Sequence, residues 1–133
     1  MQLERLKSAF GALPSDEERL SYLMELGREV PAAARDEANI VEGCSSKVWA
    51  EMAIEGGAVR LRFSSDSRIV AGLLHIVRSI YEGAPVAEAA RIDAEAVFDA
   101  LGLLALVSAA RQAGVKAVVD KIRKFATTQS GGK

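Results

Sequence analysis

The sequence has few of the residues on which many functional classes depend. Its 133 residues include one cysteine and one histidine, 5% are aromatic, and the formal net charge is −1. One thiol cannot by itself form an internal disulfide, a redox dithiol or a cysteine-rich zinc or iron–sulfur site. Near-neutral charge and few aromatic side chains argue against a nucleic-acid-binding surface. These absences exclude a disulfide-stapled secreted fold and favour the reducing cytoplasm.

Long hydrophobic runs are also absent. The longest, Leu101–Ala110, contains a glycine and a serine and has about half the length of a membrane span. The N-terminal residues have a helical pattern without the apolar region of a signal peptide. We therefore expect a cytoplasmic protein with no membrane segment. Half of the residues are hydrophobic, which fits one domain over 1–126, and the polar residues 127–133 are expected to form a flexible tail.

Apolar periodicity predicts one strand pair among helices. Alternation over 48–54 resumes over 59–63 after Gly56 and Gly57, which is typical of a hairpin with a primed turn. The charged residues between the apolar ones are expected to pair across the strands on a solvent-facing side: Glu51 and Glu55 with Arg60 and Arg62.

Helical spacing accounts for most of the remaining chain. Ser15 begins a capping box, Asp66 with its flanking serines can cap a central helix carrying Ile69 to Ile80, and Asp93 can cap a later one. A final helix is expected from about Ser108. This order predicts an α+β domain with helices packed on one face of a small antiparallel sheet.

Cys44 lies in the segment 31–46, where no apolar period is sustained. Long irregular segments are uncommon in compact domains unless they are functional. The flanking Gly43 and Ser45 leave the sulfur reachable, and Lys47 can lower the pKa of the thiol. Cys44 is therefore a candidate nucleophile, and the alternative is a small buried hydrophobic residue.

The other candidate residues point less clearly to a chemical role. His75 lies between apolar residues of the central helix, which favours a structural histidine over a Cys–His hydrolase. Trp49 either covers the sheet or forms an exposed apolar contact near the thiol. Arg111 lies near the start of the final helix, where a cation is unfavourable, so it is either a surface arginine or a contact for an anionic partner. Gly114 costs about 1 kcal/mol in a helix and indicates close packing.

A set of ordered motifs runs through the chain. Residues 37–49 read EANIVEGCSSKVW, residues 65–73 read SDSRIVAGL, residues 101–103 read LGL, and Arg111 is followed by Gly114. Together they resemble the SufE/CsdE family of sulfur acceptors for cysteine desulfurases. The likeness covers nearly the whole chain and implies a SufE/IscU-like fold.

The resemblance also implies a role. A cysteine desulfurase of the SufS or CsdA type, which carries pyridoxal phosphate, would pass persulfide sulfur to Cys44. The chain itself would hold no cofactor or metal, would stimulate the desulfurase, and would hand the sulfur to an iron–sulfur scaffold. The likeness assigns partner binding or thiolate support to residues around this cysteine: Gly43, Ser45, Lys47, Asp66 and Arg111.

The chain departs from its relatives before Arg111. Relatives commonly read His-Leu-Ser-Pro-Ser there, whereas residues 106–110 read LVSAA, so a role for an imidazole at that place is not expected. Three alternatives remain open: an iron–sulfur scaffold of similar fold, a desulfurase-binding regulatory module without covalent sulfur transfer, and a stand-alone thiol enzyme.

Overall fold

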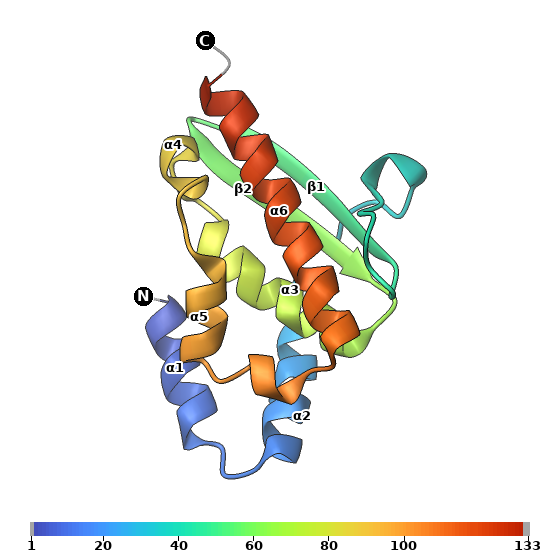
Figure 1. Ribbon diagram of the computed structural model, residues 1–133, viewed down its shortest axis with the longest axis vertical. Coiled ribbons are helices and arrows are strands. Elements are labelled where there is room, and N and C mark those ends of the chain that lie inside the picture. Colours follow the sequence, from blue (N-terminus) through green and yellow to red (C-terminus); the bar gives the residue numbers. More distant parts are fainter. Residues whose placement is uncertain (1, 132–133) are drawn as a thin grey trace.

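The structure, a computed structural model, describes residues 2–131 (Figure 1). Its helices are α1 (Gln2–Ala12), α2 (Asp16–Gly27), α3 (Arg68–Tyr81), α4 (Val86–Ala89), α5 (Ala94–Ala100) and α6 (Ala109–Gly131), with 3₁₀ turns η1 (Glu37–Asn39) and η2 (Leu104–Leu106). Strands β1 (Val48–Glu55) and β2 (Ala58–Ser65) form an antiparallel sheet. The fold is therefore α+β, as the sequence predicts. Between residues 2 and 131, no helix is both long and apolar enough to cross a membrane.

The hairpin has the predicted register. Glu55 pairs with Ala58 across a turn in which Gly56 and Gly57 have φ values of 59° and 81°, the left-handed region that primed turns require. The apolar side chains of β2 lie buried on one face, and the charged ones point to the other. On that outer face Arg60 Nε lies 3.5 Å from a carboxylate oxygen of Glu55, as expected.

Helices α3 and α6 cover the inner face of the hairpin. Helix α6 crosses this face diagonally, and α3 packs against β2 and α6 (Figure 1). Helix α3 begins where the Ser67 hydroxyl accepts the N–H of Val70 at 3.2 Å. Its wide apolar arc, including Ile76 and Val77 at 0% exposure, makes it the centre of the core.

Helices α1 and α2 form an antiparallel pair that packs on α3. The predicted cap is present, because the Ser15 hydroxyl accepts the N–H of Glu18 at 3.1 Å. Helices α2 and α3 approach so closely that a Cβ at Gly72 would overlap the carbonyl oxygen of Leu23. A glycine is therefore needed in the middle of α3.

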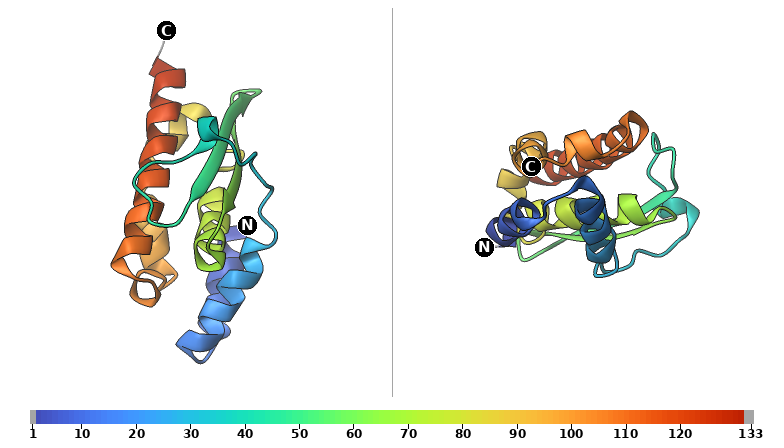
Figure 2. Two further views of the ribbon diagram at one scale, coloured as in Figure 1. Left: turned by 90° about the vertical axis from the view of Figure 1, so that its right-hand side faces the viewer. Right: turned by 90° about the horizontal axis from the view of Figure 1, so that it is seen from below.

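The segment 31–39, here called the strap, crosses the outer face of the hairpin. The N–H of Phe63 donates to the carbonyl of Pro31 at 3.0 Å, and the N–H of Ala34 donates to the Glu51 carboxylate at 2.8 Å. In Figure 2 (left) the strap lies on the side of the hairpin away from α6, and the chain that follows bends back toward α6. This face was expected to be open to solvent, but the strap covers part of it.

The C-terminal helix is longer than the sequence predicts. A flexible tail was expected over 127–133, but α6 continues to Gly131, with the side chains of residues 127–129 exposed. Adding a residue to an existing helix gains one backbone hydrogen bond, so propagation does not require an apolar face. The last two residues of the expected tail, 132 and 133, lie outside the described residues.

Candidate functional site

Cys44 lies in a short loop, residues 42–47, here called the Cys loop. The neck of the loop is closed, because the N–H of Val41 donates to the carbonyl of Val48 at 2.9 Å and Ile40 pairs with Trp49. Gly43, with φ of 93°, allows the chain to reverse just before the cysteine. The structure therefore presents Cys44 on a loop whose two ends are tied together.

The Cys loop rests on α6. The thiol of Cys44 donates to the carbonyl oxygen of Gly114, with Sγ and O 3.4 Å apart. A Cβ built on Gly43 would lie 3.3 Å from Cβ of Ala117, one helical turn further along α6. The sequence indicated close packing at Gly114, and its neighbour is the candidate nucleophile itself.

The environment of Cys44 favours the protonated thiol. The residue is only half-exposed, and burial raises the pKa of the thiol above its ordinary value. The hydrogen bond to the Gly114 carbonyl also requires the S–H proton, so it stabilises the neutral form. Since the thiolate is the reactive species, the resting structure holds Cys44 in a less nucleophilic state.

Lys47 anchors the loop through its backbone. Its carbonyl accepts the N–H of Asp66 at 3.2 Å and the hydroxyl of Ser65 at 2.9 Å. Its side chain is exposed and forms no ion pair within the part of the chain that the structure describes. Ser45 is also exposed. Among the described residues the Cys44 thiol bonds to the Gly114 carbonyl, and no hydrogen bond joins it to the Lys47 ammonium that the sequence suggested.

Asp66 forms a surface ion pair with Arg35 of the strap. Its carboxylate lies 3.0 Å from Arg35 Nη1, and the Arg35 guanidinium stacks 4.7 Å from the ring centroid of Trp49. The helix cap that the sequence assigned to this region is Ser67 and not Asp66. Trp49 is 7% exposed under this arginine, so it covers the sheet and is not an exposed contact.

Arg111 lies in the first turn of α6, three residues before Gly114. This spacing puts the two residues on the same side of the helix, so Arg111 lies on the side that faces the Cys loop. Its N–H donates to the Ser108 hydroxyl at 3.3 Å. Within residues 2–131 its guanidinium has no hydrogen-bonding or ion-pair partner. The residue is half-buried.

His75 is a buried residue of α3 whose charged neighbour is Glu29. Its Nε2 lies 3.8 Å from a carboxylate oxygen of Glu29, and burial lowers the pKa of the imidazole. His75 is therefore buried, as the sequence predicts for a structural histidine. Among the described residues, no group of three or more His, Cys, Asp or Glu side chains is placed to hold a metal ion.

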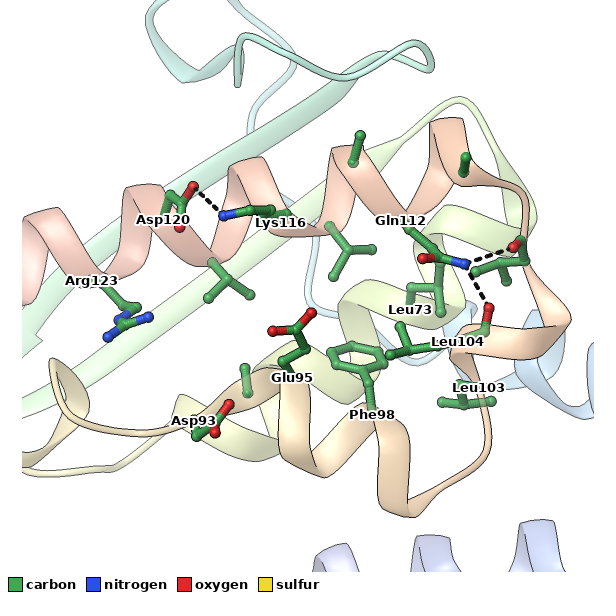
Figure 3. Close-up of a pocket in the computed structure, with 16 residues that line it drawn as sticks. Leu73, Asp93, Glu95, Phe98, Leu103, Leu104, Gln112, Lys116, Asp120 and Arg123 are labelled. Carbon is green, nitrogen blue, oxygen red and sulfur yellow. Dashed lines mark hydrogen bonds and ion pairs between the residues drawn. The ribbon is translucent and has the colours of Figure 1, made fainter.

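A cavity of about 350 Å³ lies on the other side of α6. Figure 3 shows Glu95 and Phe98 of α5 on one side of it and Lys116 and Gln112 of α6 on the other. Helical spacing at 100° per residue puts Lys116 and Arg123 nearly opposite Gly114. The cavity is therefore separated from Cys44 by the thickness of the helix.

Comparisons with known proteins agree over nearly the whole chain. The family model "SufE: Fe-S metabolism associated domain" matches residues 4–126. An uncharacterized SufE-like protein of Rhizobium meliloti is 34% identical over 131 residues, covering 93% of this chain and 94% of its own. The sulfur acceptor protein CsdE of Escherichia coli is 33% identical over 123 residues, covering 90% of this chain and 84% of its own.

A solved structure has the same fold. The solution structure of a hypothetical protein from Thermus thermophilus superimposes with a TM-score of 0.77 and 22% identity, covering 95% of this chain and 93% of that one. Because its sequence identity is low, this likeness bears on the fold alone.

Proposed function

The chain belongs to the SufE family, and on that premise we propose that it accepts sulfur from a cysteine desulfurase onto Cys44. One observation carries the assignment to this residue. Cys44 is the sole cysteine of the chain. It lies on a loop that is tied at its neck and, within residues 2–131, held at its tip by a single side-chain hydrogen bond. A relative that is named a sulfur acceptor shares a third of the sequence.

The transfer is an exchange at sulfur. The Cys44 thiolate attacks the outer sulfur of the donor's persulfide, a new S–S bond forms on Cys44, and the donor's S–S bond breaks. The donor cysteine leaves as a thiolate, so the sum of oxidation states is unchanged and no further oxidant is needed. Pyridoxal phosphate would serve the partner's reaction only. The persulfide on Cys44 would then pass to an iron–sulfur assembly scaffold.

Because the pKa of the thiol is raised, the thiol must first be deprotonated before sulfur can be transferred. The resting thiol is protonated and bonded to Gly114, so attack requires the Cys loop to leave α6 and the proton to be lost. This arrangement keeps the thiol less accessible to other reagents before the donor docks.

Intact mass spectrometry tests the proposal. The chain is incubated with a cysteine desulfurase, pyridoxal phosphate and cysteine, and we expect a species heavier by one sulfur atom. The substitution Cys44→Ser removes the acceptor and should abolish this species. If Cys44→Ser still stimulates the desulfurase fully, covalent transfer is wrong and the regulatory module is the correct function.

Arg111 is proposed to support the thiolate or the partner contact, because it lies on the Cys-loop side of α6 without a charged partner among the described residues. We expect Arg111→Ala to fold normally and to slow sulfur acceptance about tenfold, the effect of losing one charge-assisted hydrogen bond of about 1.5 kcal/mol. The rate of mass gain measures this. Acceptance at the parent rate would make Arg111 an ordinary surface arginine. Arg91→Ala, an exposed arginine just after α4, is the matched control.

A further inference from the structure

The cavity between α5 and α6 exists because both helices pack on α3 more closely than on each other. Leu73 of α3 lines the space between them. The volume of about 350 Å³ lies within the range of small-molecule sites, roughly 300–1,000 Å³. The cavity therefore has the size of a ligand site, and the proposed sulfur transfer does not use it.

One end of the cavity is apolar. Figure 3 shows Leu103 and Leu104 at this end, with Phe98 beside them. The Gln112 amide nitrogen lies there too, but it donates to the carbonyl of Leu104 at 2.6 Å and to that of Val107 at 3.1 Å. Both N–H groups of the amide are therefore occupied within the chain, and this end suits an apolar side chain of a ligand.

The other end of the cavity carries charged groups of both signs. In Figure 3 the Glu95 carboxylate points from α5 toward α6, and among the described residues it forms no ion pair. Arg123 of α6 donates from Nε to the Ala90 carbonyl at 3.4 Å, and between residues 2 and 131 its guanidinium has no ion-pair partner. The Asp93 carboxylate accepts the N–H of Ala96 through one oxygen. This end therefore offers both donors and acceptors to a ligand.

A buried hydroxyl lies near the charged end. Tyr81 is 0% exposed, and its hydroxyl has no hydrogen-bond partner in the part of the chain that the structure describes. Burial raises the pKa of Tyr81, and the charges that also act on it are those of Arg123, Asp93 and Asp120, which line the cavity. Since such an influence falls with distance, the hydroxyl lies close to them. Asp120 pairs with Lys116 at 3.5 Å, so the groups left for a ligand are the other two charges and this hydroxyl.

We propose that this cavity binds a free α-amino acid with a large apolar side chain. The side chain lies against Phe98 at the apolar end, and the ammonium group bonds to the carboxylates of Asp93 and Glu95. The carboxylate of the amino acid pairs with the guanidinium of Arg123, which suits the planar carboxylate. The site lies across α6 from Cys44, and the inference does not rest on the proposed function.

The test compares three probes with one apolar body in ¹H–¹⁵N chemical-shift titrations of the isolated chain. The probes are L-phenylalanine, 2-phenylethylamine, which lacks the carboxylate, and 3-phenylpropanoate, which lacks the ammonium group. We expect L-phenylalanine to bind at least about tenfold more tightly than either of the others, because each of these loses a charge-assisted contact. If L-phenylalanine does not bind, or if either of the others binds as tightly, the proposal is wrong.

Charge variants test the contacts to the head group. Glu95→Gln and Arg123→Gln should each weaken the binding of L-phenylalanine about tenfold. The matched controls are Asp99→Asn and Lys124→Gln, exposed neighbours that do not line this cavity, and they should bind like the parent. Circular dichroism checks that each variant is folded. Folded charge variants that bind like the parent would refute the assignment.

A further pair of variants tests the position of the ligand. Ala113 is exposed and lines the cavity, so Ala113→Leu should narrow it and weaken binding at least about tenfold. Ala110→Leu, at an exposed position outside the cavity, should leave the affinity unchanged. Equal affinities of the two variants would contradict the proposal. No desulfurase takes part in these titrations, so their outcome is separate from that of the mass experiment.

Discussion

At the scale of single residues, His75 links the stability of the core to pH. Burial lowers the pKa of its imidazole, and the Glu29 carboxylate opposes this only in part. Its Nδ1 is buried without a hydrogen-bond partner among the described residues. Protonation therefore costs more in the folded protein than in the unfolded chain.

We expect the free energy of unfolding to fall as pH falls from 7.5 to 5. The stabilising contribution of neutral His75 is complete above the unfolded pKa of about 6.5, and it is lost as pH drops through the lower folded pKa. Urea unfolding of the parent and of His75→Leu, which does not titrate, measures it. The variant should lose less stability over this interval, and equal losses would contradict the argument.

The candidate residues were predictable to different extents. Cys44 could be found from sequence because it is the only thiol and lies in an irregular segment beside a glycine. The acceptor of its proton could not, because Gly114 lies 70 positions away and its carbonyl belongs to every peptide unit alike. Asp66 was expected near a helix cap, and only the fold brings Arg35 beside it.

At the scale of elements, the tight crossing of α2 and α3 gives the most direct stability prediction. A Cβ at Gly72 would overlap the Leu23 carbonyl oxygen, and a Cβ at Gly27 would lie 2.7 Å from the backbone nitrogen of Gly72. Neither obstacle is a flexible side chain, so the helices themselves would have to separate.

We therefore expect Gly72→Ala to reduce the free energy of unfolding by about 1–3 kcal/mol or more, in spite of the better helix propensity of alanine. Chemical denaturation measures the change. Gly11→Ala is the control, because Gly11 lies in α1 with nothing within 4 Å of the added Cβ, and it should be stabilising by up to about 1 kcal/mol. Similar effects at both positions would refute the close crossing.

The helices and strands could be predicted from the sequence, and the strap could not. Period-two alternation and Gly56-Gly57 predicted the hairpin, and its register is confirmed. The strap has no periodicity, and its position depends on single hydrogen bonds to residues far along the chain, such as Glu51. The length of α6 was also underestimated, because its last exposed turns carry no apolar signal.

At the scale of the whole molecule, the layer of helices on one face of a hairpin was predicted and is observed. The position of the Cys loop depends on both the hairpin and the helices, because β1 begins just after the loop and α6 supplies the surface beneath it. The resting contact therefore joins the start of the hairpin to the helix that covers its inner face.

We expect a docked partner to break this contact. Adding a cysteine desulfurase without its cysteine substrate should raise the rate at which Cys44 is alkylated, because the thiol leaves the Gly114 carbonyl and its pKa returns toward the ordinary value. Alkylation followed by mass spectrometry, with and without the partner, measures this. An unrelated protein at the same concentration is the control, and a slower reaction with the desulfurase would mean that docking buries the thiol further.

The hydrogen bond between Val41 and Val48 makes the Cys loop a tether of fixed length. Three residues lead from Val41 to Cys44, and an extended chain covers about 3.4 Å per residue, so the cysteine backbone can travel no more than about 10 Å from that bond while it holds. The volume that the Cys44 backbone can reach is a small sphere centred on the start of β1. A donor must therefore bring its sulfur within side-chain reach of this sphere, and a donor sulfur recessed well beyond that reach would be out of range for this chain however exposed Cys44 became.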